Sequence, residues 1–245
     1  MTATPADVTY GGYLRLDRIL GAQEPLSDLH DEMLFIVMHQ TMELWIKQAI
    51  HELGEAQRLI RADRPVEAYK NLARVSRIQS VMTASWDVLA TLTPIDFGRF
   101  RHVLGTSSGF QSPGFRELEF RLGIKHPAYL KHAEPHERPA LEAALAEPSL
   151  RDDAEAALER AGLSGPEGWE AVYRNPERYW ELYQLAEKLV DIDDALATWR
   201  HKHLVTIERI IGGKTGTGGS AGAAYLASTL PKRAFPDLWS LRTRL

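Results

Sequence analysis

The most constraining feature of this sequence is a long helical pattern between Asn175 and Gly212. Asn175 suits the cap of a helix, Pro176 suits its first position, and Gly212 suits its end. The residues of one face recur at steps of three and four, which is typical of a helix with one side against a core. These residues are Leu189, Ile192, Leu196, Trp199, Thr206 and Ile210. The pattern predicts one long amphipathic helix.

A histidine, His203, falls in register with this inward face. A second long pattern runs from Ser27, its expected cap, to Ile60, and His39 lies on a face beside its main stripe. An imidazole that faces a core needs a partner for each ring nitrogen, and either a hydrogen-bond acceptor or a metal ion can be that partner. One such histidine is more simply a structural residue. Two in one helical chain leave a structural role and a ligand site evenly balanced.

Helical patterns dominate the rest of the chain, and strand patterns are almost absent. We expect helices at 27–61, 66–92, 95–104, 114–122, 137–162, 175–212 and 221–243. No linker separates two cores, so the prediction is a single all-α domain over residues 1–245. A polar, proline-rich region at about 126–170 is expected to be a peripheral helical insert. Its histidines, His126, His132 and His136, fit no usual zinc motif.

Composition narrows the class of protein. The 245 residues are 44% hydrophobic and 25% charged, with a formal net charge of −4 and scattered Lys and Arg, so nucleic-acid binding is not expected. No apolar run approaches the roughly 20 residues of a membrane span. The absence of cysteine excludes disulfides, thiolate-bound haem and cysteine-held iron–sulfur clusters. We expect a cytoplasmic protein without a membrane segment.

Two polar segments are candidates for ligand binding. Arg101 follows Phe97 by one helical turn, and it is either a surface side chain or a guanidinium that holds a carboxylate. The glycine-rich stretch 212–222 contains Gly-Lys-Thr, but Glu208 stands where a phosphate loop needs glycine, and no strand precedes it. A nucleotide site is therefore excluded there. A lid over a small polar ligand and a flexible connector both remain open.

These features together fit a haem pocket between helices. One neutral histidine would bind the iron and a second would face its open coordination position. Apolar and aromatic side chains would exclude water, and an arginine would hold an acidic substrate. Because histidine is the only strong nitrogen ligand and cysteine is absent, haem b bound by His203 is the expected form.

Five segments of the chain carry a family resemblance. They are TYGGYLRLDRIL (9–20), HDEMLFIVMHQTMELWIKQAIHEL (30–53), LTPIDFGRFRHVLGTSSGFQS (92–112), RYWELYQLAEKLVDIDDALATWRHKHL (178–204) and GGKTGTGGSAG (212–222). In this order they closely resemble the tryptophan 2,3-dioxygenases, and the likeness runs from about residue 9 to the end. The resemblance implies an all-α enzyme of the indoleamine/tryptophan dioxygenase type, with haem b and usually four identical subunits. It also implies that dioxygen opens the indole ring of L-tryptophan to give N-formylkynurenine.

The resemblance assigns roles to the residues around the haem. His203, rather than His201, corresponds to the axial ligand of the haem iron. His39 corresponds to the distal, catalytic histidine, which receives a hydrogen bond from the indole N–H. Ser108 and Trp86 correspond to residues beside the haem.

The resemblance also assigns substrate contacts. Phe35 corresponds to a wall of the indole pocket, and Arg101 to the anchor of the substrate carboxylate. Phe97 stands where bacterial relatives often have tyrosine, and Thr217 corresponds to a loop threonine at the amino-acid end of the substrate. An N-terminal arm, about residues 1–24, would complete the pocket of a neighbouring subunit through Tyr10, Tyr13 and Leu14.

The chain is short for this family, and its region 126–170 is compressed. A tryptophan derivative as substrate, or the insertion of a single oxygen atom, is therefore an alternative function. A haem-binding gas sensor without catalysis is a third hypothesis. Arg101 and Thr217 argue against it, since sensing a gas needs no amino-acid anchor.

Overall fold

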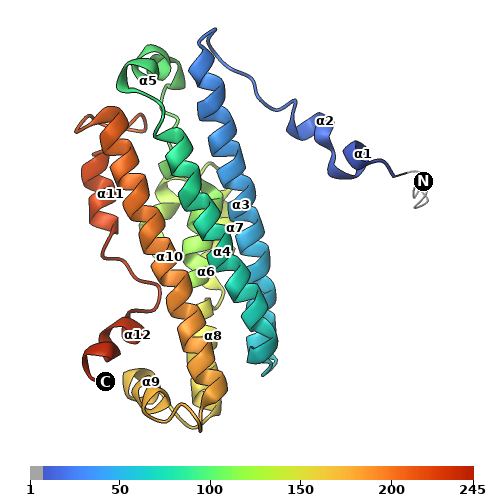
Figure 1. Ribbon diagram of the computed structural model, residues 1–245, viewed down its shortest axis with the longest axis vertical. Helices are drawn as coiled ribbons and strands as arrows, with labels where there is room; N and C mark the ends of the chain where they lie inside the picture. Colours follow the sequence, from blue (N-terminus) through green and yellow to red (C-terminus); the bar gives the residue numbers. More distant parts are fainter. Residues whose placement is uncertain (1–7) are drawn as a thin grey trace.

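Three long helices form the body of the protein in the computed structural model, which describes residues 8–245. They are α3 (His30–Arg61), α4 (Pro65–Leu89) and α10 (Trp180–Ile211), and α4 packs along both of the others (Figure 1). No strand occurs within residues 8–245. The all-α prediction is confirmed.

The remaining helices are short and surround this body or extend from it. They are α1 (Tyr10–Leu14), α2 (Leu16–Ile19), α5 (Pro94–Phe100), η2 (Arg101–Leu104), η3 (Gly109–Gln111), α6 (Pro113–Leu122), η4 (Pro127–His132), α7 (Arg138–Ala146), α8 (Leu150–Arg160), α9 (Gly165–Arg174), α11 (Ala223–Thr229), α12 (Pro236–Ser240) and η5 (Leu241–Thr243).

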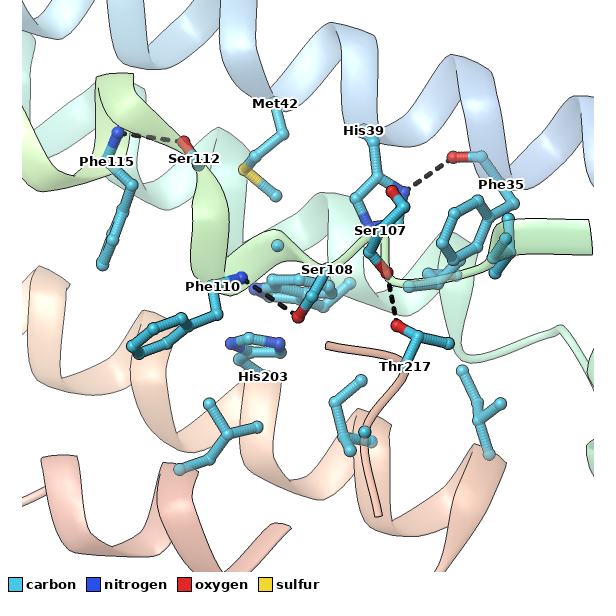
Figure 2. Close-up of a pocket in the computed structure, with 18 of the residues that line it drawn as sticks. Phe35, His39, Met42, Ser107, Ser108, Phe110, Ser112, Phe115, His203 and Thr217 are labelled. Atoms are coloured by element: carbon cyan, nitrogen blue, oxygen red, sulfur yellow. Dashed lines mark hydrogen bonds between the residues drawn. The ribbon is translucent and has the colours of Figure 1, made fainter. Parts of the chain in front are cut away.

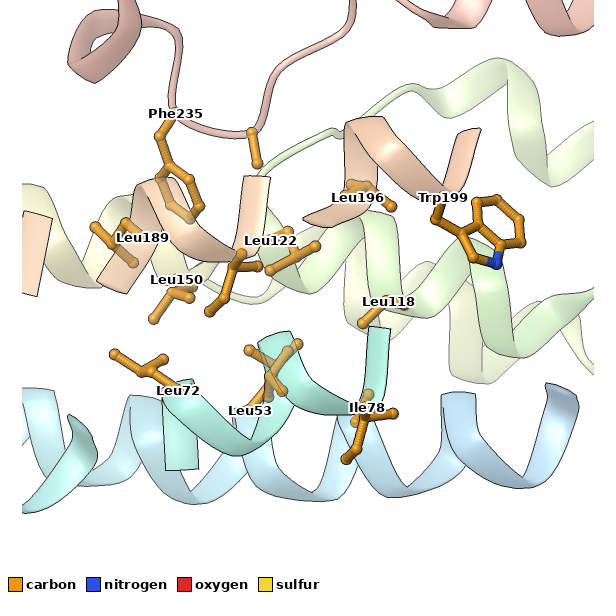
Figure 3. Close-up of a cluster of buried hydrophobic side chains, with 14 of the residues drawn as sticks. Leu53, Leu72, Ile78, Leu118, Leu122, Leu150, Leu189, Leu196, Trp199 and Phe235 are labelled. Carbon is orange, nitrogen blue, oxygen red and sulfur yellow. The ribbon is translucent and has the colours of Figure 1, made fainter. Parts of the chain in front are cut away.

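The core lies where the long helices meet α6 and α8 (Figure 3). Leu53 of α3 and Leu72 of α4 are fully buried, as are Leu150 of α8 and Leu189 of α10. Leu196 and Trp199 continue the α10 face toward the other end of the bundle. The inward face predicted for residues 175–212 is therefore confirmed, and His203 lies one turn beyond Trp199 on it.

Side-chain caps determine where the helices α5 and α6 begin. Thr93 accepts a hydrogen bond from the Asp96 amide, and Pro94 occupies the first position of α5. Ser112 caps α6 in the same way by accepting from the Phe115 amide at 3.0 Å. These two caps fix where α5 and α6 begin, on either side of the short helices η2 and η3.

Two predicted helix starts are wrong. Helix α10 begins at Trp180, because Asn175 ends α9 and its side-chain amide donates to the Ala171 carbonyl at 2.9 Å. Helix α3 begins at His30 rather than Ser27. The buried Glu32 carboxylate accepts hydrogen bonds from the Ser27 amide and hydroxyl, which holds Ser27 outside the helix.

Two helices predicted as continuous are interrupted. The stretch 137–162 divides into α7 and α8 around Pro148, whose ring cannot continue a helix. The stretch 221–243 divides into α11, α12 and η5, with Pro231 and Pro236 between and within these pieces.

The region 126–170 is only partly peripheral. Leu158 of α8 and Trp169 of α9 are buried in the main core, with Leu150 beside them. His126 has a local role as the cap of η4, where its Nδ1 accepts from the Ala128 amide at 3.2 Å. The part of the insert that covers the core therefore begins at α8.

The N-terminal helices α1 and α2 extend away from the bundle (Figure 1). Tyr10 and Tyr13 of α1 are 78% and 76% exposed, so little of their surface is buried against the described residues of their own chain. Within residues 8–245, every helix is too short or too polar to cross a bilayer. The cytoplasmic location stays a prediction.

Candidate active site

A cavity of about 530 Å³ opens between α3, α4 and α10 at the end of the bundle that carries α5. This volume lies within the usual range for sites that enclose a small molecule or cofactor. Two glycine-rich segments, 105–114 and 212–222, complete its walls together with α11. Most of the lining is apolar or aromatic, including Met42, Leu89, Leu104, Phe110, Phe115, Ile207 and Ile210.

His203 faces this cavity from α10 (Figure 2). Its ring stacks on Trp86 of α4, with centroids 4.3 Å apart and planes at 4°, and Trp199 lies 5.3 Å away. Burial, aided by the nearby His39, lowers the pKa of His203 to about 3. The ring is therefore uncharged near neutral pH. Neither nitrogen makes a hydrogen bond within the described part of the chain, so a lone pair is free to bind a ligand.

His39 faces the cavity from the opposite side, on α3 (Figure 2). Its Nδ1 lies 2.7 Å from the Phe35 carbonyl oxygen. A carbonyl can only accept, so Nδ1 must carry the hydrogen, and the neutral ring then presents Nε2 as an acceptor. Burial lowers the pKa of His39, although the Phe35 contact opposes the shift. The tautomer suits a ligand that offers an N–H group.

Aromatic rings line the cavity next to His39. The Phe35 ring lies 4.2 Å from His39 and 5.9 Å from Phe97, measured between centroids. Phe97 in turn meets Phe100 edge to face at 5.4 Å, and Phe100 is fully buried. This cluster presents an apolar surface of fixed shape, which fits a flat aromatic ligand better than a flexible chain.

Arg101 and the loop 212–222 form the polar rim of the cavity. The Arg101 guanidinium donates to the Thr215 carbonyl. The Thr217 hydroxyl donates to the Ser107 carbonyl at 2.5 Å, which ties the two glycine-rich segments together (Figure 2). The loop thus lies over the cavity. Of the two interpretations of this loop, its docked position supports a lid and not a flexible connector.

Ser108 lies at the junction of these two loops. Its hydroxyl accepts from the Phe110 amide at 3.4 Å, and its amide donates to the Gln111 side chain at 3.1 Å. These reciprocal bonds cap the short helix η3. Ser108 therefore lines the cavity from a capped turn.

A buried charged triad in the cavity wall was not anticipated from the sequence. Glu119 of α6 bridges two arginines, Arg116 at 2.5 Å and Arg200 at 2.7 Å. All three are at least nine-tenths buried. Tyr225 of α11 also lines the cavity. The spacing of Arg116 and Glu119 along one helix was a visible signal, but their pairing with Arg200 depends on how α6 meets α10.

The cavity collects most of the site residues predicted from the sequence. Those that line it are Phe35, His39, Trp86, Phe97, Arg101, Ser108, His203 and Thr217. His201 is exposed on α10, so of the two histidines at this end of α10 it is His203 that lines the cavity. Tyr10, Tyr13 and Leu14 lie on α1 outside it.

The fold and the cavity define a class of protein: a helical bundle with two neutral imidazoles on opposite walls of an apolar chamber, which is suited to enclosing a cofactor and an aromatic ligand. A sequence model described as tryptophan 2,3-dioxygenase matches residues 2–170 and 169–245. The chain belongs to the tryptophan 2,3-dioxygenase family.

Curated relatives extend this likeness over nearly the whole chain. A tryptophan 2,3-dioxygenase of Caulobacter vibrioides is 58% identical, with 98% of this chain and 99% of the relative covered. Those of a Bradyrhizobium species and of Bacillus cereus are 50% and 48% identical, covering 97% and 98% of this chain and 93% of each relative. The Caulobacter alignment has 260 positions against 245 residues here, so this chain has gaps relative to it.

Proposed function

We propose that this protein is a haem-dependent dioxygenase that opens the indole ring of L-tryptophan to give N-formylkynurenine. The C2–C3 bond breaks and both atoms of one dioxygen enter the product as carbonyl oxygens, so no external reductant is consumed. The observation that carries the proposal is a pair of neutral histidines, His39 and His203, on opposite walls of one apolar cavity with Arg101 at its rim. Family membership supports it.

The cavity fits haem b. His203 is uncharged near neutral pH, partnerless at both nitrogens among the described residues, and held in one orientation by the Trp86 stack. These are the properties of an imidazole ready to bind a metal ion. Trp86 and Ser108 would lie beside the macrocycle. When bound, the haem would supply ferrous iron for the activation of dioxygen.

The remaining residues hold tryptophan. Nε2 of His39 accepts a hydrogen bond from the indole N–H, and Phe35 and Phe97 enclose the ring. Arg101 donates to the carboxylate with a geometry that lysine cannot copy. Thr217 borders the amino-acid end. Phe97 brings no hydroxyl to this contact, so the carboxylate depends more on Arg101.

A single-turnover reaction with ¹⁸O₂ tests this function. Ferrous protein with L-tryptophan should give a product heavier than tryptophan by two labelled oxygen atoms, with the absorbance of N-formylkynurenine. A product with one added oxygen would favour the monooxygenase alternative. Haem binding without tryptophan binding or turnover would contradict both enzymatic functions and favour a sensor.

We further propose that the protein is a homotetramer in which the N-terminal arm of one subunit covers the pocket of another. Tyr10 and Tyr13 expose most of their surface, and burying large aromatic side chains against a second subunit is favourable. A row of exposed apolar residues also follows one side of α3. It comprises Leu29, Met33, Val37 and Leu44. An apolar stripe of this kind suits an interface between copies.

Co-expression of two defective chains tests the exchange of arms. One chain carries Tyr10→Ala, Tyr13→Ala and Leu14→Ala; the other carries His203→Ala and an intact arm. Mixed oligomers should recover activity well above the sum of the two chains alone, because intact arms then meet intact pockets. As a control, placing the arm substitutions on the His203→Ala chain as well should prevent recovery. Equal activity in both mixtures would show that the arm does not act between subunits.

A further inference from the structure

The loop 212–222 is fastened to the segment 101–108 by two hydrogen bonds, from Thr217 to Ser107 and from Arg101 to Thr215. The loop also closes on itself, since the Gly216 amide donates to the Ser220 carbonyl at 3.1 Å. This docked arrangement brings one glycine of the loop unusually close to the opposite segment.

That glycine is Gly218. A Cβ atom on it would lie 2.6 Å from Cβ and 3.1 Å from Oγ of Ser108. Two Cβ atoms cannot approach this closely, whereas the next nearest atom, the Thr106 carbonyl oxygen, would be at an ordinary 3.5 Å. Unlike Gly219 and Gly222, Gly218 does not have a left-handed backbone. Contact with Ser108, and not backbone conformation, is what requires glycine here.

We propose that Gly218 is a positioning residue whose missing side chain lets the loop 212–222 dock on Ser108 as a closed lid. The docked loop sets Thr217 against Ser107 and the Thr215 carbonyl against Arg101. Arg101 then binds the lid backbone with one nitrogen and keeps its other N–H groups for a carboxylate. The identification of this carboxylate as that of tryptophan rests on the proposed function. The docking of the loop does not depend on that function.

Trypsin can report the docking without haem or substrate, because Lys214 lies in the loop and is exposed. Cleavage at a folded site depends on how often the segment opens. Gly218→Ala should speed cleavage after Lys214 by about tenfold, as measured by mass spectrometry of early fragments. Gly213→Ala is the matched control, since its Cβ would meet nothing within 4 Å and its backbone is not left-handed. The control removes any general effect of a stiffer loop.

A double-mutant cycle identifies the contact. Ser108→Gly removes both atoms that the new Cβ of Gly218→Ala would strike. Of the three close contacts of that Cβ, only the ordinary one with the Thr106 carbonyl oxygen, at 3.5 Å, would then remain. Ser108→Gly can change the rate of cleavage by itself. Adding Gly218→Ala in that background should not increase the rate further. If Gly218→Ala cleaves no faster than Gly213→Ala, the proposal is wrong. It is equally wrong if the acceleration persists unchanged in the Ser108→Gly background.

Substrate binding then links the docking to function. In the haem-loaded protein, Gly218→Ala should raise the Kd for L-tryptophan about tenfold, and Ser108→Gly/Gly218→Ala should bind no more weakly than Ser108→Gly alone. An unchanged Kd beside the expected proteolysis would overturn the role of the lid in binding. Expected proteolysis in a protein that binds no tryptophan at all would instead refute the proposed function and leave the docking intact.

Discussion

Replacement of His203 by alanine is expected to remove the Soret band of bound haem and to lower tryptophan oxidation more than about 100-fold. The estimate is a lower limit, because loss of even the outer-shell partners of metal ligands costs 10–100-fold. His203 is the imidazole inside the cavity that is neutral and makes no hydrogen bond within the described chain. Its removal leaves a space beside Trp86 with no nitrogen ligand on that wall.

His201→Ala is the matched control, because His201 lies two residues away on the same helix and is exposed. It should keep the haem spectrum and the activity of the unmodified protein. Added imidazole should restore part of the spectrum of His203→Ala by occupying the vacated space. An unaltered Soret band in His203→Ala without imidazole would show that another residue binds the iron.

Replacement of Arg101 by alanine is expected to raise the Kd for L-tryptophan ten- to a hundredfold. A hydrogen bond to a charged group contributes about 1.5–3 kcal/mol, and each 1.4 kcal/mol is about a tenfold change in affinity. Arg101→Lys should recover little of the loss, since an ammonium cannot form the two-pronged contact and also hold the Thr215 carbonyl. Binding titrations of the haem spectrum would measure these changes.

Two comparisons test whether Arg101 acts through the carboxylate of tryptophan. Arg99→Ala removes an exposed guanidinium two residues before Arg101, near the end of α5 and 3.9 Å from Asp96, and should leave the affinity unchanged. Tryptamine lacks the carboxylate, so its weak binding should be nearly the same in Arg101→Ala and the unmodified protein. If Arg101→Ala weakened tryptamine as strongly as tryptophan, Arg101 would act through the lid or the fold rather than through the carboxylate.

The regular parts of the fold were predictable, and the helix ends were not. Periodic apolar residues from Leu189 to Ile210 identify the α10 face because burial repeats with the helical turn. The start of α10 depends instead on Asn175, a good cap that here ends the preceding helix. Likewise, Ser27 would cap α3 if Glu32 did not bind it from the side. Local propensity cannot decide between two such uses of one polar group.

The candidate site divides in the same way. His39 and His203 stood out because a polar ring interrupts an apolar helical face. The tautomer of His39 could not be predicted, because it follows from the distance between Nδ1 and the Phe35 carbonyl. The ion pair between Glu119 and Arg200 could not be predicted either, since these residues meet only where α6 packs against α10.

The sequence by itself determined that this chain forms long helices with histidines on their buried faces, because periodicity along one helix is a local property. Only the tertiary structure decided that both rings open on one cavity, that α8 and α9 join the core, and that Gly218 touches Ser108. The physical reason is that these contacts join residues far apart in the chain. Their distances depend on the packing of whole helices, which no single segment specifies.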